Sequence, residues 1–201
     1  MNKKYIYETH LHTSEGSACG RSRAIDIVDA YKAAGYTGII ITDHFFYGNT
    51  AVDRSLPWGE WVNGFCKGYE NALEEGNRIG LQVFFGWESG YKGTEFLIHG
   101  LDKDWLLAHP EIRDADVKTQ YELVHAGGGM VIHAHPFREA PYIPEIRLFP
   151  EYVDGVEAVN ATHSGTLTKS RCMGHPEFND RAIDYADRHQ LAKTAGSDQH
   201  S

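Results

Sequence analysis

Histidine and acidic residues recur along this chain at spacings that suit metal binding. His10 and His12 are two residues apart, and so are Asp198 and His200. Side chains at positions i and i+2 of a strand point to the same side, so both imidazoles of the first pair can reach one metal ion. The chain has 12 histidines among 201 residues. Imidazole is the commonest protein metal ligand and carries protons near neutral pH, so this number calls for a chemical explanation.

The elements that must position these groups follow from the pattern of apolar residues. Short runs rich in β-branched and aromatic residues predict seven strands, over 5–12, 38–42, 82–87, 95–101, 129–133, 155–160 and 193–196. Helical spacing predicts helices over 24–34, 60–80, 117–126 and 179–190. The proline-rich stretch 137–152 is expected to form a long structured loop. Because strands and helices alternate, we expect a parallel α/β architecture.

Two α/β architectures fit this alternation. Seven strands suggest a closed or nearly closed barrel, and an open doubly wound sheet gives the same pattern. No glycine-rich nucleotide-binding motif follows any predicted strand, which removes the main support for the nucleotide-binding open sheets.

The histidines and carboxylates cluster at the C-terminal ends of the predicted strands, where parallel α/β proteins place their active sites. These residues are His10, His12, Asp43, His44, Glu88, His99, His133, His135, Asp198 and His200. One strand-end histidine alone is more often a packed core or loop residue than a ligand. Repetition at six strand ends favours a shared metal site.

Composition narrows the class of protein. Asp and Glu number 28 against 19 Lys and Arg, a formal net charge of -9, which argues against a nucleic-acid-coating surface and for a small substrate. Residues 1–201 are expected to form a single domain. Three cysteines, Cys19, Cys66 and Cys172, without CxxC spacing make a disulfide framework improbable. With no apolar stretch long enough for a signal peptide or membrane span, a cytoplasmic protein without a membrane partner is expected. The sequence does not indicate an oligomeric state.

Five short motifs resemble those of one known family. HLHT at 10–13, TDH at 42–44, GWE at 86–88, HP at 135–136 and GSDQH at 196–200 follow the order of the PHP family, named for polymerase and histidinol phosphatase. The resemblance covers essentially the whole chain. It implies a distorted seven-stranded βα barrel, similar to a TIM barrel, with two or three divalent metals at the strand ends. Because the chain stops one residue after His200, the last covering helix is expected to be absent.

The resemblance also implies a set of ligands. One metal is expected on His10, His12, Glu88 and Asp198, and Glu88 is expected to bridge to a second metal held by His99 and His135. His44 and His200 are expected to hold a third metal or to act beside the first two.

Some assignments stay open at this stage. His135 precedes proline, as the family motif requires, while His133 remains a possible substitute ligand or supporting donor. Asp43 is counted with the catalytic residues, although orienting a ligand imidazole is its more usual part. In the loop after HLHT many members have an aspartate or histidine that binds the third metal. This chain has TSEGSACGRS instead, where Cys19 or Glu15 can substitute or a small loop residue can have no ligand role.

A mixed histidine and carboxylate site suits Zn, Mn or Fe, and the sequence does not choose among them. Two such metals generate a hydroxide that attacks a phosphate ester. Arg138 is the first candidate for binding phosphoryl oxygens, followed by Arg21 and Arg147. His163 is expected to protonate the leaving oxygen or to contact substrate. The remaining histidines are expected to be structural or exposed: His109, His125, His175 and His189.

The expected function is therefore hydrolysis of a small phosphate monoester, such as a sugar, histidinol-type or nucleotide phosphate. Three alternatives remain: a DNA-directed 3'-5' exonuclease-like domain, a metal-binding regulatory module without turnover, and hydrolysis of another bond such as an amide.

Overall fold

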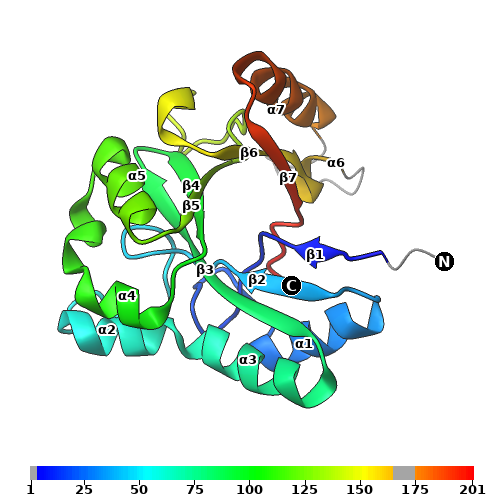
Figure 1. Cartoon of the computed structure of the whole chain (residues 1–201), viewed down its shortest axis with the longest axis vertical. Coiled ribbons are helices and arrows are strands. Elements are labelled where there is room, and N and C mark those ends of the chain that lie inside the picture. The colour runs from blue at the N-terminus through cyan, green and yellow to red at the C-terminus, as the bar shows by residue number, and fades with distance from the viewer. Residues whose placement is uncertain (1–3, 165–174) are drawn as a thin grey trace.

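The computed structural model describes residues 4–164 and 175–201 (Figure 1). Its seven strands form one sheet in chain order. They are β1 Tyr7–Glu8, β2 Gly38–Ile41, β3 Gln82–Tyr91, β4 Thr94–His99, β5 Met130–Ala134, β6 Gly155–Asn160 and β7 Ala192–Gly196. The helices are α1 Ala24–Ala33, α2 Trp58–Phe65, α3 Lys67–Ile79, α4 Lys103–Ala108, α5 Val117–Ala126, α6 Ala161–Ser164 and α7 Pro176–His189, with two short 3-10 helices, Pro110–Asp114 and Pro150–Tyr152.

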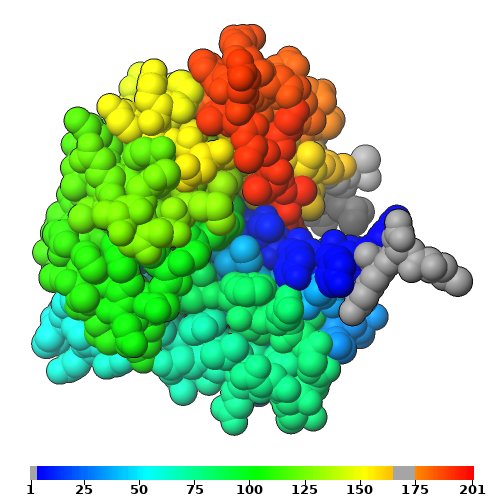
Figure 2. Space-filling view, in the orientation of Figure 1, coloured from blue at the N-terminus to red at the C-terminus, as the bar shows by residue number. Residues whose placement is uncertain are grey.

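The sheet curls into a nearly closed barrel, as predicted, and its seam lies between the first and last strands. Beyond β1 and β7 the backbones meet, where Asp198 N donates to His10 O at 2.8 Å and His12 N donates to Gln199 O at 3.0 Å. The carboxylate of Glu8 also joins the two edges, accepting from the amides of His10 and Ser197, each at 2.9 Å. Figure 2 shows the blue N-terminal segment filling the space between the red C-terminal segment and the cyan and green strands. Because the His10 amide bonds to the Glu8 side chain, β1 is shorter than the predicted 5–12.

The expectation of parallel strands is wrong for β4. It runs antiparallel to both β3 and β5. Only Lys92 and Gly93 connect β3 to β4, and both have a positive φ, 52° and 88°. Two such residues make the tight turn of a hairpin, whereas a parallel crossover needs a dozen or more residues. The other strand pairs are parallel.

The predicted helix over 60–80 is two helices that separate at Cys66. Trp61 and Phe65 of α2 pack into a core beneath β3 and β4, whereas Leu73 of α3 packs against a second core beneath β2. Tyr69 contacts both cores. The apolar spacing of four therefore continues from α2 into α3, because each helix buries its apolar face against a different part of the sheet.

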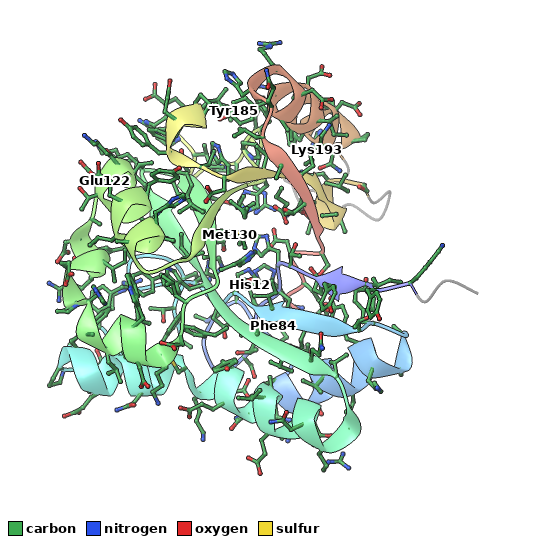
Figure 3. The ribbon with its side chains drawn as sticks, viewed as in Figure 1. His12, Phe84, Glu122, Met130, Tyr185 and Lys193 are labelled. Carbon is green, nitrogen blue, oxygen red and sulfur yellow. The ribbon has the colours of Figure 1, made fainter. Side chains whose placement is uncertain are left out.

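The helices cover the outside of the barrel and leave its interior to a mixture of polar and apolar side chains. Figure 3 shows His12 inside the ring of strands and Tyr185 and Lys193 in its outer layer. Leu97, Ile132 and Ala134 form a small apolar cluster apart from the outer cores. No helix in the described part of the chain is long and apolar enough to cross a membrane.

Candidate metal centre

A cavity of about 530 Å³ opens where most strands have their C-terminal ends. Its lining includes His44, Glu95, Arg138, Tyr142, Asp198 and His200. These residues are far apart in the sequence and follow β2, β5 and β7 or begin β4. The barrel therefore gathers most of the predicted groups at one end, as its topology requires.

Glu88 lies at the centre of the buried cluster. Its Oε1 is 3.4 Å from His10 Nε2 and 3.0 Å from His135 Nε2. Its Oε2 is 3.6 Å from His12 Nε2 and 2.7 Å from His44 Nδ1. Backbone pairing of His44 with Glu88 sets this proximity. Four predicted histidines thus surround one predicted carboxylate.

The donor atoms of this cluster fit a bound cation. His10 Nδ1 contacts Glu157 Oε1 at 2.9 Å, and His12 Nδ1 contacts Ser17 Oγ at 3.2 Å. Ser17 Oγ donates its proton to Asp43, so in the contact with His12 it accepts, and His12 Nδ1 is the donor. The Glu157 carboxylate can only accept, so His10 Nδ1 is also a donor. The two Nε2 lone pairs then face each other at 3.2 Å. Glu88 Oε2 is buried, and its close contact with His44 Nδ1 does not have the geometry of a hydrogen bond, so a shared metal ion suits the arrangement.

The two carboxylate oxygens of Asp198 have different partners: one faces the histidine cluster, and the other accepts hydrogen bonds from side chains behind it. Its Oδ1 is 3.5 Å from His10 Nε2 and 3.3 Å from His12 Nε2, while Oδ2 accepts from Arg138 and from Asn160. Burial favours the neutral acid, but Arg138 and His10 outweigh it and hold the pKa of Asp198 well below its usual range. Asp198 and His135 also have positive φ angles, 53° and 26°, a strain typical of functional positions.

His99 does not join the cluster, and Glu95 lies there instead. The prediction assumed that the end of β4 faces the same way as the other strand ends. Because β4 is antiparallel, His99 pairs with Gly86 and Met130, toward the other end of the barrel. Glu95 pairs with Ala134, next to His135, and its carboxylate lies 3.7 Å from His135 Nε2. The ligand atoms of His44, Glu88 and Glu95 lie within 4.8 Å of one another.

His133 and Asp43 both lie outside the cluster, and in the described structure only Asp43 of the two has a hydrogen-bonded link to it. His133 stacks on Phe96 at 5.1 Å between ring centroids and packs near Tyr185, in the layer outside the sheet. Strand alternation fails to align it with His135 because β5 ends at Ala134 and His135 has a positive φ. The carboxylate of Asp43 accepts from Thr13 and Ser17, each at 2.7 Å, and so orients the hydroxyl that fixes His12.

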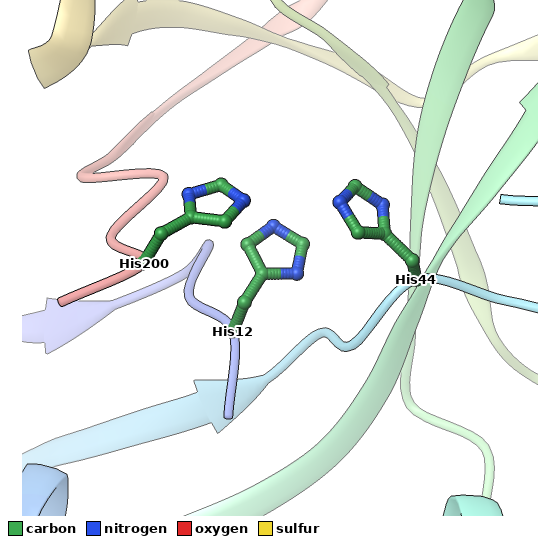
Figure 4. Close-up of side chains that lie close together, drawn as sticks. All are labelled: His12, His44 and His200. Atoms are coloured by element: carbon green, nitrogen blue, oxygen red, sulfur yellow. The ribbon is translucent and has the colours of Figure 1, made fainter. Parts of the chain in front are cut away.

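A second group of donors lies toward the cavity mouth. The ligand atoms of His12, His44 and His200 fall within 4.8 Å of one another, and Figure 4 shows the His12 ring between the other two. The half-buried thiol of Cys19 has His44 and His200 as its neighbours. Burial opposes ionisation, but these two neighbours lower the pKa of Cys19 to about 6. Glu15 instead accepts from the amide of Ala24 at the start of α1.

Arg138 forms the cationic wall of the cavity, and His163 supports it. Arg138 donates to Asp198, to Thr162 Oγ1 at 3.3 Å and to His163 Nε2 at 3.3 Å. His163 Nδ1 lies 3.2 Å from Asn179 Oδ1. Burial and the neighbouring guanidinium lower the pKa of His163 to about 4. A neutral imidazole that accepts from Arg138 is poorly suited to the predicted protonation of a leaving group.

The other candidate arginines lie elsewhere. Arg21 is exposed, and Arg147 pairs with Glu145 at 2.5 Å and donates to Lys92 O at 2.8 Å. The cavity lining in the described chain includes neither.

Sequence reasoning missed one buried supporting carboxylate, Glu157. It contacts His10 Nδ1 at 2.9 Å and accepts from the amides of His135 at 3.0 Å and Asn160 Nδ2 at 3.1 Å. Its one sequence signal was a charged residue inside the otherwise apolar run GVEAVN.

The remaining histidines, which were expected to be structural or exposed, have local partners. His109 contacts Trp105 O, His125 contacts Asp154, His175 contacts Glu177, and His189 packs against Tyr185. Cys66 is a free buried thiol, and Cys172 lies outside the described residues.

Comparison with known proteins agrees with this fold. The PHP domain family model matches residues 8–195. No curated protein matches the chain with significant similarity. A Bifidobacterium adolescentis protein inferred to be a metal-dependent phosphoesterase has a similar structure, with a TM-score of 0.64 and 16% identity over 99% of this chain and 89% of its own.

Two further structures share the fold. A two-domain Bacteroides vulgatus protein that contains a predicted PHP-like metal-dependent phosphoesterase has a TM-score of 0.67 and 16% identity, over 100% of this chain and 57% of its own. A Chromobacterium violaceum amidohydrolase with bound sulfate and no metal has a TM-score of 0.63 and 15% identity, over 96% of this chain and 87% of its own. At these identities the likeness concerns the fold.

Proposed function

The chain belongs to the PHP domain family, and on that premise we propose that it is a metal-dependent phosphoesterase that hydrolyses a small phosphate monoester. The observation that carries the proposal is the position of Glu88. Its two buried oxygens face the imidazole nitrogens of four histidines, and the cavity that the cluster adjoins has a guanidinium on its wall. Metal-binding donors and a fixed cation together suit a phosphoryl group.

Two neighbouring sets of donors would hold the metals. His10, His12, Glu88 and Asp198 form one set, as the family resemblance implies. We assign Glu88, His135 and Glu95 to the second, with Glu95 in the place expected for His99. Zinc, manganese and iron suit such nitrogen and oxygen ligands. Metals bound there would supply a hydroxide nucleophile at neutral pH and polarise phosphoryl oxygens.

The chain's own residues bind and orient the substrate. Arg138 is held on three sides, by Asp198, Thr162 and His163, so its guanidinium is fixed before substrate enters. A preorganised cation of this kind stabilises charge that develops on phosphoryl oxygens. Lys92, at the hairpin tip, lines the same cavity and adds positive charge. His163 acts in this account as a positioning residue, since its Nε2 accepts from Arg138.

The size and charge of the site favour a small substrate. The cavity volume of about 530 Å³ falls in the range of small-molecule pockets. Acidic side chains share its lining, and the net charge of the chain is -9, which disfavours long polyanions. We therefore propose a sugar, histidinol-type or nucleotide phosphate rather than nucleic acid as the partner.

A panel of phosphate esters tests the proposal. Protein stripped by a chelator is reloaded separately with Zn, Mn and Fe, and phosphate release is measured from sugar, histidinol and nucleoside monophosphates. We expect metal-dependent release from at least one monoester. Arg138→Ala is expected to lower kcat/KM by roughly 10²–10³-fold, as removal of a preorganised charge does. Arg147→Ala, in the same loop but outside the cavity lining, is the matched control and should keep activity.

Other outcomes would contradict the proposal in distinct ways. Metal-loaded protein that cleaves no ester would point to a regulatory module. Degradation of single-stranded DNA without monoester hydrolysis would point to an exonuclease. Amide hydrolysis that survives Arg138→Ala would point to the chemistry named for the Chromobacterium violaceum protein.

A further inference from the structure

A second hollow adjoins the cavity beside the metal centre. It has a volume of about 330 Å³ and shares Tyr47, Gly90 and Lys92 with the lining of the first cavity. That volume alone reaches the lower end of the range for small-molecule pockets. A phosphate ester whose phosphoryl group lies against Arg138 must direct its leaving group away from the buried cluster. The second hollow therefore offers room for a leaving group next to the proposed site of hydrolysis.

Tyr47 lies between the two hollows, with a ring that is exposed and yet fixed. Its side chain is 62% exposed, and its hydroxyl donates to Asp114 Oδ1 at 2.6 Å. Asp114 pairs in turn with Arg113 at 2.6 Å. The Arg113 guanidinium lies 5.2 Å from the centre of the Phe46 ring, which packs edge-on against Tyr47 at 5.1 Å between centroids. An aromatic face held at both ends can stack on a planar group at little cost in side-chain entropy.

The edge of β3 that faces away from β4 has no neighbouring strand in the described chain beyond Glu88, since β2 ends at Ile41. The last main-chain bonds on this edge are those of Glu88. Its N–H donates to Asp43 O at 3.0 Å, and its carbonyl accepts from Phe45 N at 2.8 Å. Because peptide groups alternate in direction along an antiparallel pair, Gly90 directs its N–H and C=O to the same edge. The described chain places no partner there for either group, so one donor and one acceptor face the passage between the hollows.

Gly90 also keeps this passage open. A Cβ built on it would meet no atom of the described chain within 4 Å beyond its immediate neighbours. The space that a side chain would fill is therefore available to a ligand, directly beside the free peptide groups of β3.

We propose that Tyr47 and Gly90 form the subsite for the leaving group, and that this subsite selects an alcohol carrying a planar nitrogen heterocycle. The inference deepens the proposed function and rests on it. The heterocycle stacks on the Tyr47 ring, and the donors and acceptors on its edge bond to the peptide groups of Gly90. A ringless sugar alcohol would leave the aromatic face without a partner. A nucleobase and an imidazole share the required chemistry, and the experiment separates them.

Binding of the free alcohols tests the subsite without any metal, because Tyr47 and Gly90 are not among the candidate ligands. The chelator-treated full chain is titrated with adenosine, histidinol and glycerol, and binding is followed by saturation-transfer NMR. We expect binding of adenosine or histidinol, whichever ring fits, and weaker binding of glycerol. Tyr47→Ala should weaken binding of the preferred alcohol about tenfold, the scale of one aromatic stacking contact. Tyr5→Ala is the matched control, since Tyr5 is 63% exposed and lines neither hollow, and it should bind as the wild type does.

A substitution in the passage tests the same subsite during turnover. In metal-loaded protein, kcat/KM is measured for the phosphate of the preferred alcohol and for glycerol phosphate. Gly90→Leu should lower the ratio of the two values about tenfold, because its side chain fills the space beside β3. Gly90→Ala, whose single methyl group has room, should lower the ratio less. Metal content by plasma mass spectrometry verifies that the compared proteins carry the same ions.

Several results would overturn the inference. These are absence of binding by both ring-bearing alcohols, tighter binding of glycerol, equal binding by wild type and Tyr47→Ala, or an unchanged ratio in Gly90→Leu. Protein that hydrolyses phosphate esters without favouring a ring refutes this inference alone. Protein that binds a ring-bearing alcohol through Tyr47 but cleaves no ester refutes the proposed function and leaves the binding subsite in place.

Discussion

The two sides of the metal cluster are built differently. On one side, the segments that follow β1, β2 and β7 contribute His10, His12, His44 and Asp198, and all of these strands run parallel to a neighbour. On the other side, the antiparallel β4 contributes Glu95, its second residue, rather than His99, its last. The candidate ligands on the parallel side were predictable from their motifs. On the antiparallel side, strand direction decided which residue reaches the cluster.

The difference shows how a two-residue turn changes the chemistry of a site. Lys92 and Gly93 reverse the chain, so β4 runs along the barrel in the direction opposite to that of β3. Glu95 then lies beside His135 in the cluster, and His99 lies toward the other end of the barrel. With Glu95 in the place expected for His99, the proposed second set of donors is richer in oxygen than the family resemblance implies.

Removal of the shared carboxylate should have the largest effect. Glu88 contacts four histidines, so Glu88→Gln is expected to abolish metal binding to both sets of donors. Activity should fall by more than the roughly 10²–10³-fold typical of losing one electrostatic group. Metal content by plasma mass spectrometry and kcat/KM measure this directly. Retention of both metals in Glu88→Gln would show that Glu88 is not the shared ligand.

A matched pair of substitutions on β4 tests which of two residues, Glu95 or His99, binds a metal. Glu95→Gln should weaken the binding of one metal and lower kcat about 10²-fold, whereas His99→Gln should leave metal content unchanged and activity within a few-fold. Isothermal titration of both variants with the same metal makes the comparison. Loss of a metal in His99→Gln with full retention in Glu95→Gln would restore the original assignment.

Loss of the buried carboxylate behind the parallel side should have a smaller effect. Glu157 fixes His10 through Nδ1 without reaching a metal. Glu157→Gln is therefore expected to weaken metal affinity by about 10–100-fold, the usual cost of losing a carboxylate partner of a ligand histidine. Glu145→Gln, at the surface partner of Arg147, controls for the change of charge. Equal affinities in the two variants would show that Glu157 does not orient His10.

The smallest effect concerns stability and pH. Burial, helped by the charge on His10, lowers the pKa of His99 to about 4, from 6.5 in the unfolded chain. Between these values the unfolded state binds a proton that the native state does not, so stability falls as pH decreases through the window. His99→Leu should remove about 2 kcal/mol of the stability loss between pH 7 and pH 5. Urea unfolding at both pH values measures this, and an unchanged difference would indicate that His99 titrates normally in the fold.

The sequence predicted the elements better than their directions. Strand positions followed from apolar runs, and the clustered residues of HLHT, TDH and GSDQH followed from motifs that need only a strand end. Glu95 could not be chosen, because its position depends on a turn whose only signal is the pair Lys92–Gly93. Glu157 was missed for a related reason, since a buried carboxylate is recognisable only once its partner His10 is near.

Anomalous diffraction from crystals of the metal-loaded protein tests directly whether Glu88 lies between two metal ions. Data collected at the absorption edge of the bound metal locate each ion independently of the protein atoms. We expect one ion on each side of Glu88. The first is contacted by His10, His12 and Asp198, and the second by His135 and Glu95. Absence of any ion at Glu88, or an ion held by His99, would contradict this expectation.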